Sequence, residues 1–123
     1  MKRPYADLYL LPLPKKNLAK YKKVASTFGK MCREYGALGY REFVGDDLFP
    51  KGVISFTKKT SLKPGEVLVA AVVDFKSRSH RDAVLKKMFK DPRMDKMVKQ
   101  SEADPLTDME KMVYGGFKAI VDV

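Results

Sequence analysis

The residues best suited to chemistry form one short run, Arg78-Ser79-His80-Arg81-Asp82. This run places two arginines and the only histidine of the chain at the expected start of a helix, where free backbone N–H groups and the helix dipole attract anions. A small anionic ligand is therefore one possible partner, and His80 can act as an acid or base near neutral pH. We favour a structural reading, in which Ser79 and Asp82 cap the helix, because a lone histidine without a nucleophile argues poorly for catalysis.

Two further motifs lie where strands are expected to end or bend. Gly45-Asp46-Asp47 offers paired carboxylates to a cation or a proton, although turn chemistry after a strand is the reading we favour. Tyr114-Gly115-Gly116-Phe117 either lets a ligand approach the backbone or forms a bulge at a barrel corner, and we favour the bulge. The sequence has no Cys/His cluster and no phosphate-binding glycine loop, so it predicts no metal and no other cofactor.

Length and composition predict a single globular domain over residues 1–123. The hydrophobic fraction of 45% is enough for a core without disulfides, and no apolar run approaches the roughly 20 residues of a membrane span. The N-terminal residues lack the apolar segment of a signal peptide, and the single cysteine, Cys32, cannot form an internal disulfide. We therefore expect a cytoplasmic protein with no membrane partner.

The net charge of +10 is concentrated in two segments. Residues 15–35 carry seven basic and one acidic side chain, and residues 76–100 carry nine basic and three acidic side chains. A basic stripe of this kind can bind nucleic acid weakly. No base-reading motif accompanies the charge, so we favour solvated helix faces and do not expect nucleic acid as a partner.

The elements that must position these motifs follow from the hydrophobic pattern. Residues 15–35 form the clearest helix, with Gly36 placed to end it and an apolar stripe at spacings of three and four: Leu18, Tyr21, Ala25, Phe28, Cys32 and Tyr35. A second helix is predicted from Ser79 to about Lys90, and a short third one begins at Asp91-Pro92. Strands are predicted over residues 5–11, 38–44, 67–75 and 111–121, and residues 46–65 form a long connection that contains a short strand at 53–56.

The order β-α-β-β-α-β is that of an α+β, ferredoxin-like subunit, an antiparallel sheet with its helices on one face and strands one and three in the centre. The other sheet face must then be covered or exposed. Residues 67–75 are apolar until Asp74, and the strand at 5–11 adds Tyr9 and Leu11, which we place on the uncovered face, opposite Leu8 and Leu10. Two such faces packed together would form a barrel, so we expect a homodimer, a dimeric α+β barrel.

Several colinear segments also resemble the YbaA-like family of uncharacterised proteins, which belongs to the dimeric α+β barrel superfamily. They include Leu10-Leu11-Pro12-Leu13-Pro14-Lys15, Val44-Gly45-Asp46-Asp47, Ser77-Arg78-Ser79-His80-Arg81-Asp82, Asp91-Pro92-Arg93-Met94 and Met112-Val113-Tyr114-Gly115-Gly116-Phe117. The resemblance implies a ferredoxin-like subunit and a barrel-forming dimer, and it implies no activity. Tyr35, where we expect histidine before Gly-Ala, and the strong basic charge depart from the family pattern.

Three functions remain open at this level. The first is a small-molecule enzyme or binder with a cavity between sheet and helices, whose polar lining we expect to be Tyr9, Asp46, Arg78, His80 and Tyr114. The second is a structural or regulatory homodimer without a ligand. The third is weak nucleic-acid binding through the basic helices, which the aliphatic third strand does not support, since RNA-recognition domains stack bases on aromatic residues there.

Overall fold

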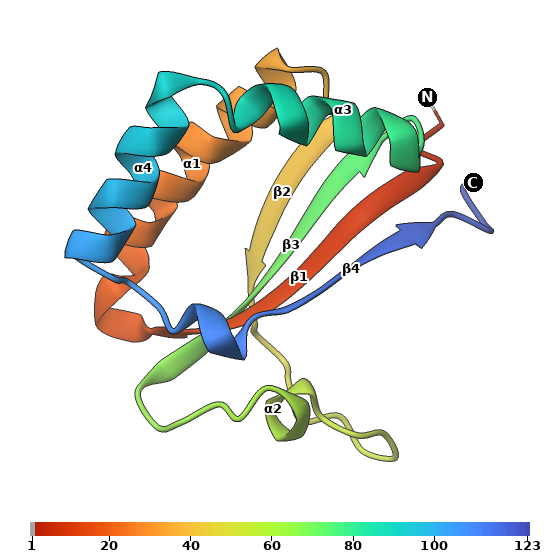
Figure 1. The fold of residues 1–123 in the computed structure, drawn as a ribbon. Helices are drawn as coiled ribbons and strands as arrows, with labels where there is room; N and C mark the ends of the chain where they lie inside the picture. Colours follow the sequence, from red (N-terminus) through yellow and green to blue (C-terminus); the bar gives the residue numbers. More distant parts are fainter. Residues whose placement is uncertain (1) are drawn as a thin grey trace.

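A computed structural model describes residues 2–123, which form one four-stranded sheet and the helices that pack on it (Figure 1). The main elements are β1 (Tyr5–Pro14), α1 (Leu18–Glu34), β2 (Gly39–Val44), β3 (Glu66–Phe75), α3 (Arg78–Met88), α4 (Pro92–Ala103) and β4 (Val113–Lys118). Every paired strand is antiparallel, and the strand order is β2-β3-β1-β4. The predicted ferredoxin-like order, with the first and third strands in the centre, is confirmed.

β1 is longer than the sequence predicts because it continues through Pro12 to Pro14. It pairs with β3 over its whole length, whereas its pairing with β4 stops at Leu10. Beyond Leu10 no strand pairs with β1 on the β4 side. A backbone N–H is therefore not needed on that side, and a proline is tolerated there. The Pro12 carbonyl on that side accepts a hydrogen bond from the Thr107 hydroxyl instead.

The sheet face that the helices cover carries the odd-numbered residues of β1 and β3. Tyr5, Leu11 and Leu13 are buried there, opposite Phe75, Val69 and Val67 in the register. Our placement of Tyr9 and Leu11 on the uncovered face is therefore wrong, and Leu8 and Leu10 lie on that face instead. The period of two shows which residues share a face, but only the packed helices decide which face is inside.

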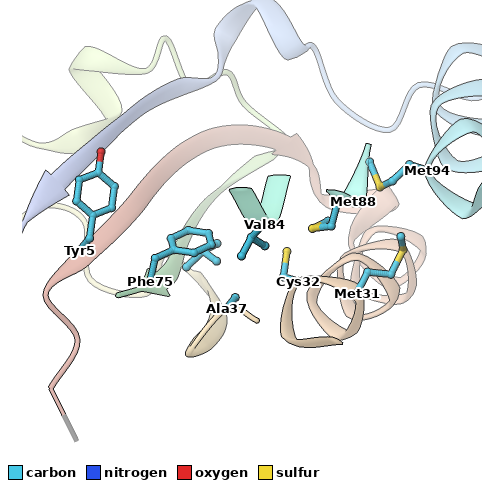
Figure 2. Close-up of a cluster of buried hydrophobic side chains, with 9 residues drawn as sticks. Tyr5, Met31, Cys32, Ala37, Phe75, Val84, Met88 and Met94 are labelled. Carbon is cyan, nitrogen blue, oxygen red and sulfur yellow. The ribbon is translucent and has the colours of Figure 1, made fainter. Parts of the chain in front are cut away.

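The core joins the sheet to α1, α3 and α4. Figure 2 shows one of its clusters, which combines side chains from every layer: Tyr5, Phe75, Met31, Cys32, Ala37, Val84, Met88 and Met94. The predicted apolar stripe of α1 is confirmed, since all six of its residues are buried or half-buried. A single 3-10 turn (Lys15–Asn17) precedes α1, and Gly36 follows it with a φ of 115°, as a left-handed helix end requires.

The connection between β2 and β3 contains no strand at residues 53–56, contrary to our prediction. Val53 and Ile54 are about two-thirds exposed, and a short helix, α2 (Phe56–Lys59), follows them. The Ser55 hydroxyl accepts a hydrogen bond from the Thr57 backbone N–H and so caps this turn. An apolar run without a neighbouring strand or a covered face has nothing to pair with, so it does not become a strand.

The later helices begin with side-chain caps. The cap of α3 is Ser77, which accepts from the His80 N–H at 3.0 Å, and not the pair Ser79 and Asp82 that we predicted. Asp91 caps α4 as predicted, with Pro92 in the first turn, but α4 runs for 12 residues and is not short. No helix in the described part of the chain has both the length and the apolar character of a membrane span.

β4 has no bulge at Gly115-Gly116, which corrects the prediction we favoured. Its register with β1 is continuous from Lys118 to Val113. A Cβ on Gly116 would collide with the Tyr5 hydroxyl. The glycine therefore makes room for the neighbouring tyrosine within a regular strand.

Candidate ligand-binding site

An apolar pocket of about 320 Å³ lies between the covered face of the sheet and helices α1 and α4. Its floor includes the register partners Tyr9 of β1 and Ala71 of β3. Further lining comes from all the surrounding segments and includes Ala25 and Phe28 of α1, Met97 of α4 and Met112 before β4. Because α1 presents its predicted stripe to this space, local periodicity and the order of elements together create the pocket.

The segment between α4 and β4 closes one end of this pocket. Thr107, Met109 and Met112 of this segment line it. The Asn17 side-chain amide donates to the Leu106 carbonyl at 2.9 Å, which ties the segment to the start of α1. These polar bonds hold the closing segment in place, so its methionines can face the pocket and adapt to what fills it.

Tyr21 and Tyr40 line the same pocket, but Glu42 already binds their hydroxyls. Each hydroxyl donates to a different carboxylate oxygen of Glu42. Burial, followed by these bonds to Glu42, raises the pKa of both tyrosines well above the usual range. Neither hydroxyl is therefore free to serve a ligand without breaking a bond to a charged acceptor.

Tyr9 is different, because within residues 2–123 its hydroxyl has no hydrogen-bond partner within 3.5 Å, although it lies near enough to Asp7 to help lower the pKa of that carboxyl. Its ring stacks on Tyr114 across the β1–β4 pair, with the ring centroids 4.7 Å apart. Burial, followed by the nearby charge of Asp7, raises the pKa of Tyr9. Tyr9 thus contributes a neutral phenol side chain to the lining of a mainly apolar pocket.

Asp7 lies beside Tyr9 on the same face of β1 and is completely buried. One carboxylate oxygen, Oδ1, accepts from the Arg81 Nη1 at 2.6 Å, and this arginine also donates to the Tyr114 hydroxyl. Arg81 lies over the ring of Tyr5 as well, 5.4 Å from the ring centroid. The other oxygen, Oδ2, has no hydrogen-bond partner although it is buried. Burial is the main reason that the pKa of Asp7 is raised, and Arg81 opposes it.

The structure brings together two of the five side chains that the sequence predicts for the pocket. Tyr9 lines it, and Tyr114 stacks on Tyr9. Asp46 and Arg78 are exposed and do not line this pocket. His80 does not line the pocket either. Its Nδ1 accepts a hydrogen bond from the Lys76 N–H at 3.0 Å, and burial lowers the pKa of its imidazole.

The sequence predicts Arg81 as part of an anion site at the start of a helix, but it does not predict Asp7 as a site residue or as the partner of Arg81. One signal was available for Asp7, since it is the only charged residue in β1. A charge in a central strand is buried and must find a partner. Nothing local identifies that partner, because Arg81 lies 74 residues further along the chain. Among residues 2–123, no three His, Cys, Asp or Glu side chains gather as a metal site requires.

Comparisons with known proteins agree with this architecture. The family described as "Protein of unknown function (DUF1428)" matches residues 4–107. The uncharacterized protein YbaA of Escherichia coli K12 is 30% identical over 118 residues, which cover 96% of this chain and 97% of YbaA, and YbaA of Shigella flexneri matches equally well. The crystal structure of a candidate antibiotic biosynthesis monooxygenase from Deinococcus radiodurans is similar in fold, with a TM-score of 0.52 and 14% identity over 97% of this chain and 95% of that one.

Proposed function

Since the chain belongs to the DUF1428 family of proteins of unknown function, we propose that it binds a small, mainly apolar molecule in the pocket between the sheet and helices α1 and α4, and that it does so as a homodimer. The observation that carries the proposal is the pocket itself. Its volume of about 320 Å³ lies near the lower end of the range for small-molecule sites, and such sites combine an apolar lining with a few polar groups. Tyr9 supplies a polar group of this kind.

Two observations support a small molecule over a nucleic acid. β3, a central strand, carries Ala70 and Val72 on the uncovered face and so has no aromatic ring there on which a base could stack. The neighbour in fold from Deinococcus radiodurans is described as a candidate monooxygenase, an enzyme class that acts on small molecules. The cavity therefore suits a compact ligand better than a polymer.

The uncovered sheet face supports the homodimer. It exposes a row of large apolar side chains from three strands, each between about 38% and 55% exposed: Leu8, Phe43, Val113 and Phe117. Arg41 is the basic exception, and its guanidinium lies over the Phe43 ring. A contiguous apolar face of this kind is usually an interface, and a second copy packed face to face would cover both sheets at once.

The pocket proposal can be tested with 2-naphthol as the probe and with two alanines of the same helix. Ala25 lines the pocket, whereas Ala19 is exposed on α1 and lies outside it. We expect 2-naphthol to bind the wild-type protein in a calorimetric titration, and Ala25→Phe to weaken that binding about tenfold or more by filling the space. Ala19→Phe should leave the affinity unchanged.

Two outcomes of this titration would contradict the pocket proposal. Absence of 2-naphthol binding to the wild-type protein would overturn the proposal. Equal losses in Ala25→Phe and Ala19→Phe would also overturn it, because the second substitution changes the same helix without reaching the pocket. Circular dichroism of both variants is the control, and we expect it to show unchanged helix content.

A further inference from the structure

The edge strand β2 leaves a row of backbone groups without a partner strand. It pairs with β3 on one side, and no strand of residues 2–123 lies on its other side. The N–H of Gly45, just after β2, donates to the Leu68 carbonyl of β3 at 2.8 Å. Because the bonded residues alternate along an antiparallel pair, Tyr40, Glu42 and Val44 direct their backbone N–H and C=O groups away from β3. These groups are open to pairing with another extended chain.

A groove of about 970 Å³ lies between this edge and α1. Gly29 of α1 packs against Tyr40 of β2, where a Cβ would collide with the tyrosine ring, so the helix comes close to the strand. The groove is lined by every residue of β2 after Gly39, and by a row of α1 residues at helical spacing that includes Lys22, Ser26, Gly29, Lys30 and Arg33. One side of the groove is thus a strand edge and the other is a helix face.

The helix face of the groove is basic and lacks counter-charges. Lys22, Lys30 and Arg33 are exposed, and none of the three forms an ion pair within residues 2–123. Both acids that line the groove are already bound, Glu34 to an arginine of α4 at 2.8 Å and Glu42 to two tyrosine hydroxyls. Uncompensated positive charge therefore lies next to free strand-pairing groups.

We propose that this groove binds an extended acidic peptide segment of a partner protein, which adds to the free edge of β2 as a further strand. The alternating donors and acceptors of a strand edge match a peptide backbone, and a nucleic acid does not carry that pattern. Charge argues against a second copy of this chain, because lysines beside an open edge repel the same lysines of a copy with a net charge of +10. The inference goes beyond the proposed function, since it assigns a different partner to a different surface.

The probe is a designed peptide, Glu-Val-Glu-Thr-Glu-Val-Glu, with blocked ends and an uncharged dye. We expect fluorescence anisotropy to show that the wild-type protein binds it at least tenfold more tightly than Lys-Val-Lys-Thr-Lys-Val-Lys, because the groove attracts negative charge. Methylation of every backbone nitrogen keeps the glutamates but removes the strand-pairing donors. It should therefore also weaken binding about tenfold or more.

Two double variants locate the peptide on the surface. Lys22→Glu/Lys30→Glu reverses two charges of the groove and should weaken binding of the acidic peptide about tenfold or more. Lys23→Glu/Lys99→Glu is the matched control, because it changes the net charge equally at two exposed lysines that do not line the groove. The control should stay within about threefold of the wild-type affinity. If the charge reversal prevents folding, Lys22→Gln/Lys30→Gln decides and should weaken binding about threefold or more.

Four results would overturn the proposal. The first is that the acidic peptide does not bind the wild-type protein. The second is equal binding of the methylated peptide, which would show association by charge alone. The third is an equal loss in the two double variants, which would place the peptide elsewhere on the basic surface. The fourth is displacement of the peptide by an oligothymidine of the same charge at the same concentration, which would identify a general anion surface. None of these results depends on the pocket, which the 2-naphthol titration tests separately.

Discussion

The Asp7 carboxylate of β1 and the Arg81 guanidinium of α3 lie 2.6 Å apart, although 74 residues separate them in the sequence. The side chain of Asp7 is about 1% exposed and that of Arg81 about 12%. Through this pair, and through the bond from Arg81 to Tyr114, α3 is tied to the two strands β1 and β4. The stability of the helix layer on the sheet should therefore depend on both partners together.

Removing one partner of this pair should destabilise the protein more than removing both. Arg81→Met leaves the buried Asp7 carboxylate unpaired, and we expect the free energy of unfolding to fall by about 3 kcal/mol. The double variant Asp7→Val/Arg81→Met has no buried charge at this place, so it should recover a large part of that loss. Urea unfolding of both variants measures the difference. A double variant less stable than Arg81→Met would contradict the expectation.

The stability should also depend on pH through Asp7. Burial raises the pKa of this carboxyl in the folded protein above its ordinary value of 3.8. The folded state therefore retains a proton that the unfolded chain has already released, and stability falls as the pH rises between the two pKa values. We expect the free energy of unfolding of the wild-type protein, relative to Asp7→Asn, to be greatest at about pH 3.5 and to decrease toward pH 7. A difference that grows with pH would refute the assignment.

The dimer proposal is tested by two phenylalanines of similar exposure. Phe117 lies on the uncovered sheet face and is 55% exposed, while Phe89 follows α3 and is 59% exposed. Phe117→Lys would bury a charge in the proposed interface, so it should weaken the dimer by about 100-fold or more. Phe89→Lys should leave the dimer intact. Sedimentation velocity at several concentrations distinguishes the two, and a wild-type protein that is monomeric throughout would end the proposal.

Gly115 and Gly116 should respond differently to alanine. A Cβ at Gly116 would collide with the Tyr5 hydroxyl, whereas a Cβ at Gly115 would lie 3.4 Å from a ring carbon of Phe117. We expect Gly116→Ala to lower the free energy of unfolding by about 1–3 kcal/mol, as overpacking does, and Gly115→Ala to change it much less. Thermal unfolding provides the measurement, and equal effects of the two substitutions would show that Tyr5 yields without cost.

Much of the fold follows from local pattern. The stripe of α1, the cap at Asp91 and the sequence of strands and helices along the chain are readable because each depends on residues close together in the sequence. The prediction of a strand at residues 53–56 fails because a strand needs a pairing partner, which a local pattern does not reveal. A short apolar run has no structure of its own until such a partner is present.

The candidate site is less predictable from pattern. Tyr9 and Tyr114 are predicted site residues because they lie near expected strand ends, and the register between β1 and β4 brings them together. Asp46, Arg78 and His80 are predicted on similar grounds, but they lie outside the pocket. Residue type and position along an element suggest chemistry, but they do not say which elements lie next to each other.

The sequence by itself determines the main helices and strands, which of their residues share a face, and the family to which the chain belongs. Periodicity and capping act over a few residues, so a single chain read in order contains them. Only the tertiary structure decides which face of the sheet is covered, that Arg81 is the partner of Asp7, and that Tyr9 lines a pocket. These features depend on contacts between distant residues, which packing selects and which no local pattern specifies.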